Sequence, residues 1–299
     1  MTARRQGPQW WANRGSVLLR QALGENRFPI DVEMLATDWS KHLAPDAPIT
    51  KVAARRLESF EGALVDGRDQ GKGWGIAYNK DIRSEGRKRF TIAHELGHFL
   101  LHRNEGPQGG FSCGQQDLAI WDHDRNPQEA EANCFAAGIL MPLDDFRAQV
   151  PAKASIDMDS LSELARDRYG VSLTACILRW LEYTERRAML VVSREGYILW
   201  AKPSRPAYRS GIFLRTRQGP PLEMPLASPL ATSDPFLISG EVIQHPARAW
   251  PWFQEPVCEE IIVADRYDLG LSLLTFAASS ARSLWAEERE PDVLDLMSR

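Results

Sequence analysis

The sequence predicts an α+β fold: a mostly helical domain with a small sheet, then a helical segment, then a smaller mixed α+β domain. Apolar residues recur at helical spacing in the first half of the chain, for example over 32–43 and 88–102. Between them, residues 57–79 alternate short apolar runs with glycines, which is typical of strands and turns. After Arg187, short apolar runs and proline-rich loops replace the helical pattern. We therefore expect three segments, 1–150, 151–186 and 187–299.

Capping residues and prolines indicate where the first helices begin and end. Helices are expected at 9–23, 32–43, 88–102 and from Pro127 to just before Pro142. Asp31 can cap the second helix. Asn126 can cap the fourth, where Pro127 fits the first helical position because no backbone donor is needed there. The polar, glycine-rich stretch 103–126 is expected to be mostly loop.

The second half of the chain is expected to pass from helices to strands. Helices over 159–168 and 173–185 flank the sequence YGVS. The stretches MLVVS and YILWAK flank Arg194-Glu195-Gly196 and predict a β-hairpin. Further strands are expected at GIFLR and EEIIVA, and the polar last ten residues are expected to fray.

Composition narrows the classes of protein. The net charge of −4 and the pI near 5.9 provide no global basic field for nucleic acid. The four cysteines stand apart with no C-x-x-C pair, which argues against a cysteine zinc cluster and a dense disulfide framework. We find no signal-peptide pattern and no apolar run of membrane-spanning length. We therefore expect a cytoplasmic protein.

The stretch His94-Glu95-Leu96-Gly97-His98 matches the zinc motif H-E-x-x-H. On a helix, residues four apart lie on the same side, so both imidazoles can share one zinc ion. Glu95 is turned about 100° away from His94 and can reach the water on the metal without being a ligand. The alternative is a buried helix with partly satisfied histidines, but burying these polar groups without a partner is unfavourable. The motif therefore predicts one zinc ion per chain, with Glu95 as general base.

Catalytic zinc takes three protein ligands and keeps one open position, so a third ligand has to be found. The candidates lie downstream of the motif: His102, Asp122, His123, Asp124, Glu129 and Glu131. His102 lies four residues after His98, on the same side of the helix, but it points away from a tetrahedral centre. We therefore expect it to orient a ligand or to be structural. Spacing does not choose between Glu129 and Glu131, and Glu129 could instead close a capping box with Asn126.

The two stretches RFTIAHELGHFLLH and EAEANCFAAGILMP resemble the ImmA/IrrE family of bacterial metallopeptidases. The resemblance is specific over 88–142, weaker over 30–87 and in YGVSLTACILRWLE, and only general beyond 187. It implies a zincin-like first domain in which Glu129 is the third zinc ligand, and it leaves Glu131 as an exposed helix residue. Asn133, one turn after Glu129, could orient a ligand imidazole or serve at the surface or in a cap.

The same resemblance implies a function. Members of the family cut a transcriptional repressor, usually a helix-turn-helix protein, in response to stress or to mobile elements. We therefore expect an intracellular endopeptidase in which Glu95 takes a proton from the water on zinc as it attacks the peptide carbonyl. The expected partner is a protein substrate, and we expect neither a membrane nor nucleic acid to be bound directly.

A regulatory DNA-binding protein with a structural zinc site is the alternative. The stretch LSELARDRYGVSLTACILRW has the pattern of a helix-turn-helix motif. A recognition helix should present basic residues, yet the second helix offers Arg179 alone on a mostly apolar surface. Internal packing is therefore the favoured interpretation of this segment. The segment 187–299 is expected to sense a ligand, to dock the substrate or to be a structural cap.

Overall fold

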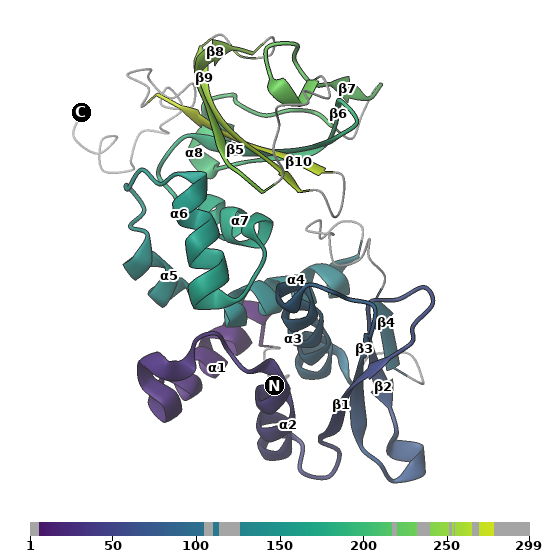
Figure 1. Ribbon diagram of the computed structural model, residues 1–299. Helices are drawn as coiled ribbons and strands as arrows, with labels where there is room; N and C mark the ends of the chain where they lie inside the picture. Colours follow the sequence, from purple (N-terminus) through teal and green to yellow (C-terminus); the bar gives the residue numbers. More distant parts are fainter. Residues whose placement is uncertain are drawn as a thin grey trace, which may run out of the picture. The chain divides into compact units, whose positions relative to one another are not determined.

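The computed structural model of the 299-residue chain describes residues 6–104, 110–113, 126–216, 220–231, 240–250, 253, 255–264 and 269–277 (Figure 1). The chain divides into two compact units. Unit 1 consists of Met1–Gln149 and Ser162–Cys176, and unit 2 consists of Val150–Leu161 and Ile177–Arg299. The expected middle segment, 151–186, contributes residues to both units.

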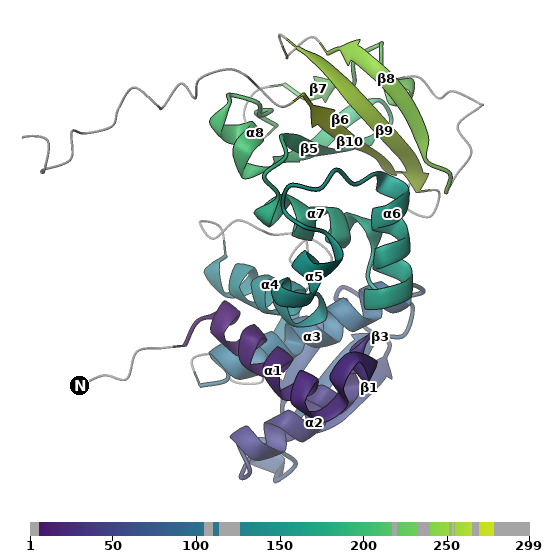
Figure 2. The same ribbon diagram turned by 90° about the vertical axis from the view of Figure 1, so that its left-hand side faces the viewer.

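Unit 1 combines helices with a four-stranded sheet. Its strands are β1 (Ile49–Arg55), β2 (Gly62–Asp66), β3 (Trp74–Asn79) and β4 (Gly110–Cys113), and its helices include α1 (Pro8–Leu23), α2 (Val32–Leu43), α3 (Glu85–His102), α4 (Pro127–Leu140) and α5 (Leu143–Gln149). The strand order is β1-β3-β2-β4, in which β1 pairs with β3 in parallel and the other pairs are antiparallel. Helices α2 and α3 pack on this sheet (Figures 1 and 2).

Helix α3 is the central element of unit 1. It begins at Glu85, three residues before the expected start, because the Ser84 hydroxyl caps it by accepting the amide hydrogen of Arg87. From Thr91 to His102 every residue is buried, as expected for a helix that is apolar on several sides. It packs on α4 on one side and on β2 and β3 on another.

Gly97 allows α3 and α4 to approach closely. A Cβ atom added at Gly97 would lie 3.1 Å from the Ala132 Cα and 3.1 Å from a ring carbon of Phe135. A larger side chain would therefore push the two helices apart. This close contact brings acidic residues of α4 next to the histidines of α3.

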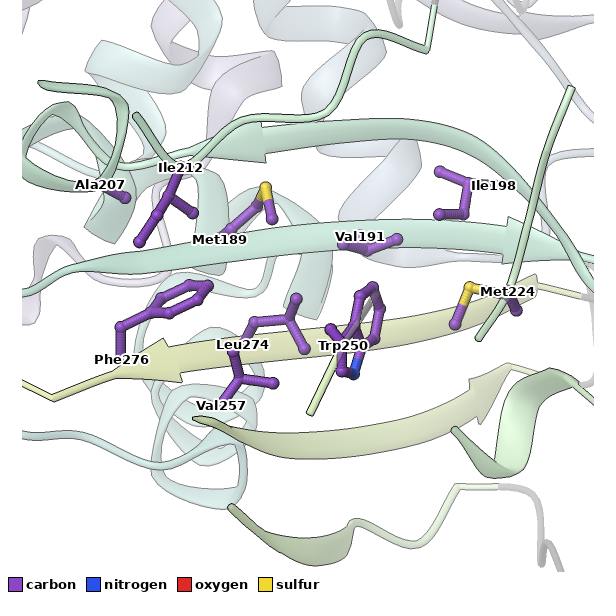
Figure 3. Close-up of a cluster of buried hydrophobic side chains, with 10 residues drawn as sticks. All are labelled: Met189, Val191, Ile198, Ala207, Ile212, Met224, Trp250, Val257, Leu274 and Phe276. Atoms are coloured by element: carbon purple, nitrogen blue, oxygen red, sulfur yellow. The ribbon is translucent and has the colours of Figure 1, made fainter. Parts of the chain in front are cut away.

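Unit 2 is built on an antiparallel sheet of six strands in the order β7-β6-β5-β10-β9-β8. The strands are β5 (Ala188–Arg194), β6 (Tyr197–Pro203), β7 (Leu222–Glu223), β8 (Ile243–Ala249), β9 (Pro256–Ala264) and β10 (Leu269–Phe276), with the short helix α8 (Arg205–Arg209) after β6. Ten buried side chains form its core, among them Met189, Trp250 and Phe276 (Figure 3). The boundary between the units falls within two helices: α6 (Met158–Glu163) and α7 (Leu173–Tyr183) each contribute residues to both units, and the π-helical turn Leu164–Tyr169 between them belongs to unit 1.

The α+β fold class is confirmed, and so is the hairpin of β5 and β6, whose turn places Glu195 and Gly196 at positive φ. The strand predicted at GIFLR is wrong. Gly211 leaves α8 with a positive φ, and Ile212 then buries its side chain in the core instead of pairing in a ladder. Strands β1 and β4 were not expected, because neither has a marked alternation of apolar and polar residues. The last ten residues lie outside the described part of the chain.

Candidate metal centre

Two buried histidines of α3 form one side of the site. His94 and His98 are fully buried and lie one helical turn apart. Their Nε2 atoms are 3.0 Å from each other, so both rings present the same nitrogen to one point. Phe111 of β4 stacks on the His98 ring, with the centroids 4.6 Å apart. Sequence reasoning does not predict this contact, since Phe111 lies in a stretch expected to be mostly loop.

Glu129 of α4 forms the other side. Its Oε2 atom lies 3.0 Å from the His94 Nε2 atom, and its Oε1 atom lies 3.3 Å from the His98 Nε2 atom. Asn126 caps α4 by accepting the amide hydrogen of Glu129 at 3.4 Å. The Glu129 carboxylate is thus directed at the histidines, while its backbone serves the cap. The alternative, in which the Glu129 side chain closes a capping box with Asn126, is therefore not needed to explain why a glutamate stands at this position.

The donor set fits a zinc ion. Among the described residues, the group that could hold a metal consists of His94, His98 and Glu129, whose ligand atoms all lie within 4.8 Å of one another. Two ligand atoms on one tetrahedral zinc ion lie about 3.3 Å apart, given bond lengths near 2.0–2.1 Å. The separations of 3.0 and 3.3 Å between the Nε2 and carboxylate atoms match this spacing without rearrangement of the helices. Imidazole nitrogen and carboxylate oxygen are both ordinary zinc ligands.

The ionisable groups of the site shift one another's pKa values. Burial alone would raise the pKa of Glu129, but the contacts of its carboxylate with His94 and His98 outweigh burial and hold that pKa well below its usual range. Burial lowers the pKa of His98 to about 4, so this imidazole is neutral at pH 7. Burial also acts to lower the pKa of His94, but Glu129 and Glu95 outweigh it and raise the pKa. A bound cation would take the place of the proton that these two carboxylates attract to His94.

Glu95 lies beside this group and is fully buried. Strand β2 passes close to its side chain: a Cβ atom added at Gly62 would lie 2.5 Å from the Glu95 Oε1 atom and 2.5 Å from Thr91 Cγ2. The glycine at the start of β2 therefore leaves the space in which the carboxylate sits. Sequence reasoning does not predict this role of Gly62, because Gly62 and Glu95 lie on different elements that only the fold brings together.

The remaining predicted residues surround the two imidazoles. His94 Nδ1 lies 2.9 Å from the Asn133 Oδ1 atom, and both residues are fully buried. His98 Nδ1 lies 3.1 Å from His102 Nδ1. The expectation that Glu131 is exposed is wrong, because its side chain is largely buried, with 24% of its surface accessible. Its Oε2 atom lies 2.9 Å from His102 Nε2. The loop candidates Asp122, His123 and Asp124 lie outside the described residues.

Comparison with known proteins supports the same interpretation of the first half of the chain. The family model of Peptidase M78, described as the IrrE N-terminal-like domain, matches residues 46–181. A solved structure of a Mycobacterium tuberculosis transcriptional regulator is similar in fold, with a TM-score of 0.51 and 15% sequence identity. That likeness covers 89% of this chain and 76% of the regulator's chain. The search of curated proteins found no match. Within the described residues, no helix combines the length and the apolar character needed to cross a membrane.

Proposed function

We propose that the protein is a zinc-dependent endopeptidase that cleaves a transcriptional repressor, because residues 46–181 match the Peptidase M78 model, which describes the IrrE N-terminal-like domain. The observation that carries the proposal is the convergence of three buried ligand atoms from two helices: the Nε2 atoms of His94 and His98 and the carboxylate of Glu129. Three protein ligands, two imidazoles and one carboxylate, are a donor set that catalytic zinc sites use.

The residues of the site have different roles in the proposed reaction. His94, His98 and Glu129 would hold one zinc ion, which when bound lowers the pKa of a coordinated water toward about 7 and polarises a carbonyl. Glu95 is the general base: its carboxylate takes the proton from the attacking water and passes it to the leaving amine. Asn133 accepts the Nδ1 hydrogen of His94, which fixes the ring with Nε2 toward the metal position.

The substrate class follows from the family resemblance. We place the activity in the cytoplasm, in a response to stress or to mobile elements, with a helix-turn-helix repressor as the protein that is cut. The four cysteines are widely spaced in the sequence and lack the pattern of a disulfide framework, which suits a reducing compartment. The role of the segment 187–299 in this response is proposed to be sensing or substrate docking.

A DNA-binding regulator with a structural zinc site is a weaker alternative. It would use α7 as the recognition helix, but Arg179 on this helix is 3% exposed and its guanidinium pairs with Glu182. A buried, paired arginine is not positioned to contact phosphates or bases. Electrophoretic mobility shift of promoter DNA by the purified protein would favour this alternative over the peptidase.

Co-expression with candidate repressors encoded nearby tests the proposal. We expect the wild type to cut one of them and the Glu95→Gln variant to cut it about 100 to 10,000 times more slowly, because the base is lost. Zinc content by mass spectrometry should stay at about one ion per chain in this variant, since Glu95 is not a ligand. Glu85→Gln, which changes an exposed glutamate at the start of the same helix, is the matched control and should cut normally. Wild-type cleavage by Glu95→Gln would remove Glu95 from the mechanism.

A further inference from the structure

A chain of hydrogen bonds leads from the metal site to a second glutamate of α4. His98 Nδ1 contacts His102 Nδ1 at 3.1 Å, and His102 Nε2 contacts the Glu131 carboxylate at 2.9 Å. Both histidines are fully buried, and the Glu131 side chain is 24% exposed. The chain thus begins at a group facing the candidate metal position and ends at a carboxylate near the surface.

When His102 is neutral, these contacts define which ring nitrogens carry hydrogen. A carboxylate accepts hydrogen bonds and donates none, so His102 carries its hydrogen on Nε2 and donates it to Glu131. His102 Nδ1 is then an acceptor, and the hydrogen between the two rings belongs to His98 Nδ1. The His98 Nε2 atom is consequently left with its lone pair, which is the state that a zinc ligand requires.

With a neutral His102, the opposite arrangement is unfavourable. If His98 carried its hydrogen on Nε2, that hydrogen would point at His94 Nε2 and Glu129, where a cation is to bind. His102 would then have to donate from Nδ1 and to present a lone pair to the Glu131 carboxylate. Two acceptors would face each other at 2.9 Å inside a buried site, which is unfavourable.

We propose that Glu131 is a positioning residue that acts through His102: it holds His98 in the tautomer whose Nε2 atom binds zinc. This inference rests on the proposed zinc site. It gives the two histidine ligands different supports, since His94 is oriented directly by the neutral amide of Asn133, whereas His98 is oriented by a charged group through one intervening ring. A carboxylate in this role strengthens the hydrogen bond and raises the basicity of the ligand.

Zinc affinity, measured by competition with a chromophoric chelator, tests the chain. We expect Glu131→Ala to weaken zinc binding about 10- to 100-fold, because the support of a ligand is lost. Glu131→Gln keeps an acceptor for His102 Nε2 and should recover part of the affinity. Glu85→Ala, which removes one negative charge from α3 at an exposed position, should bind zinc as the wild type does.

A double mutant separates the proposed route from a general effect of charge. His102→Phe should weaken binding to a similar degree, and adding Glu131→Ala to His102→Phe should have no further effect, because the connection is already broken. Additive losses would overturn the relay, as would a Glu131→Ala variant with wild-type zinc affinity. Melting of the metal-free variants provides the check that unit 1 is folded.

Histidine ring nitrogen NMR gives a second readout that simple packing would not change. In the zinc-bound wild type, His98 Nδ1 should carry a slowly exchanging hydrogen, and in Glu131→Ala this hydrogen should exchange faster. If the wild type binds no zinc, the relay and the proposed function both fall. If affinity and NMR behave as expected while no repressor is cut, the relay stands and the peptidase proposal fails.

Discussion

At the scale of single residues, the site depends on small side chains as much as on ligands. Glu95 has its place because β2 begins with a glycine, and a Cβ atom there would approach the Glu95 Oε1 atom to 2.5 Å. A general base must lie within hydrogen-bonding reach of the proton that it takes, so a displaced carboxylate loses rate even when it is chemically intact. Gly62 is therefore expected to matter for turnover although it takes no part in the chemistry.

The substitution Gly62→Ala tests this role. The added methyl group should displace the Glu95 carboxylate and lower the cleavage rate about 100-fold, while zinc content stays unchanged because the ligands are not touched. Gly75→Ala in neighbouring β3 is the matched control, since its Cβ would meet the nearest atom, the Lys51 carbonyl oxygen, at an ordinary 3.7 Å. Equal rates for Gly62→Ala and Gly75→Ala would contradict the explanation.

At the scale of elements, the sequence predicted those whose signals are local. The cap at Asp31, the Asn126-Pro127 start of α4 and the Glu195-Gly196 turn all act through neighbouring backbone atoms, and each element formed as expected. His94 and His98 were predictable for the same reason, because a helical turn fixes their spacing.

Features that depend on contacts between distant elements could not be predicted in this way. Glu129 and Glu131 lie on the same helix with similar local sequence, and the packing of α4 on α3 decides which of them reaches which histidine. Strand β4 exists because it pairs with β2, although its own four residues have little strand character. The resemblance to a known family, and not the spacing of the residues, points to Glu129.

The distance between α3 and α4 depends on side chains of both helices, and a substitution at Gly97 can change it. Gly97→Ala should force the Ala132 backbone outward by a few tenths of an ångström, since the new methyl would lie 3.1 Å from it. We expect zinc affinity to fall at least 10-fold, because Glu129 moves with α4 away from the histidines, and overpacking to cost about 1–3 kcal/mol of folding stability.

Gly138→Ala is the control for this prediction. It also overpacks α4, but on the side facing α1, where the methyl would lie 2.8 Å from the Ala12 Cβ. This variant should lose stability and keep wild-type zinc affinity. If both variants bind zinc equally, or if both lose it equally, the separation of α3 and α4 does not set the affinity. Isothermal titration with zinc and thermal melting measure the two quantities.

At the scale of the whole molecule, both units bury apolar side chains, and unit 1 also buries the candidate metal site. Unit 2 has a core of apolar side chains around Met189, Trp250 and Phe276. Unit 1 buries three imidazoles and two carboxylates in and beside one site, at His94, Glu95, His98, His102 and Glu129. Burying such groups is costly unless they are paired or bind a cation, so the stability of unit 1 should depend on the metal.

Removal of zinc by a chelator should therefore affect one unit and not the other. At a free zinc concentration about 1,000 times the dissociation constant, binding stabilises the folded state by about 4 kcal/mol, which for a unit of this size corresponds to roughly 10 °C in melting temperature. Hydrogen exchange resolves the effect along the chain: amides of α3 and α4 should exchange faster after chelation, whereas those of β5 and β10 should not change.

Glu129→Ala should behave like the chelated wild type and gain nothing from added zinc, because a ligand is missing. Equal acceleration in β5 and β10 would mean that the metal stabilises the chain as one cooperative unit, and unchanged exchange in α3 would mean that the buried polar group is stable without a cation.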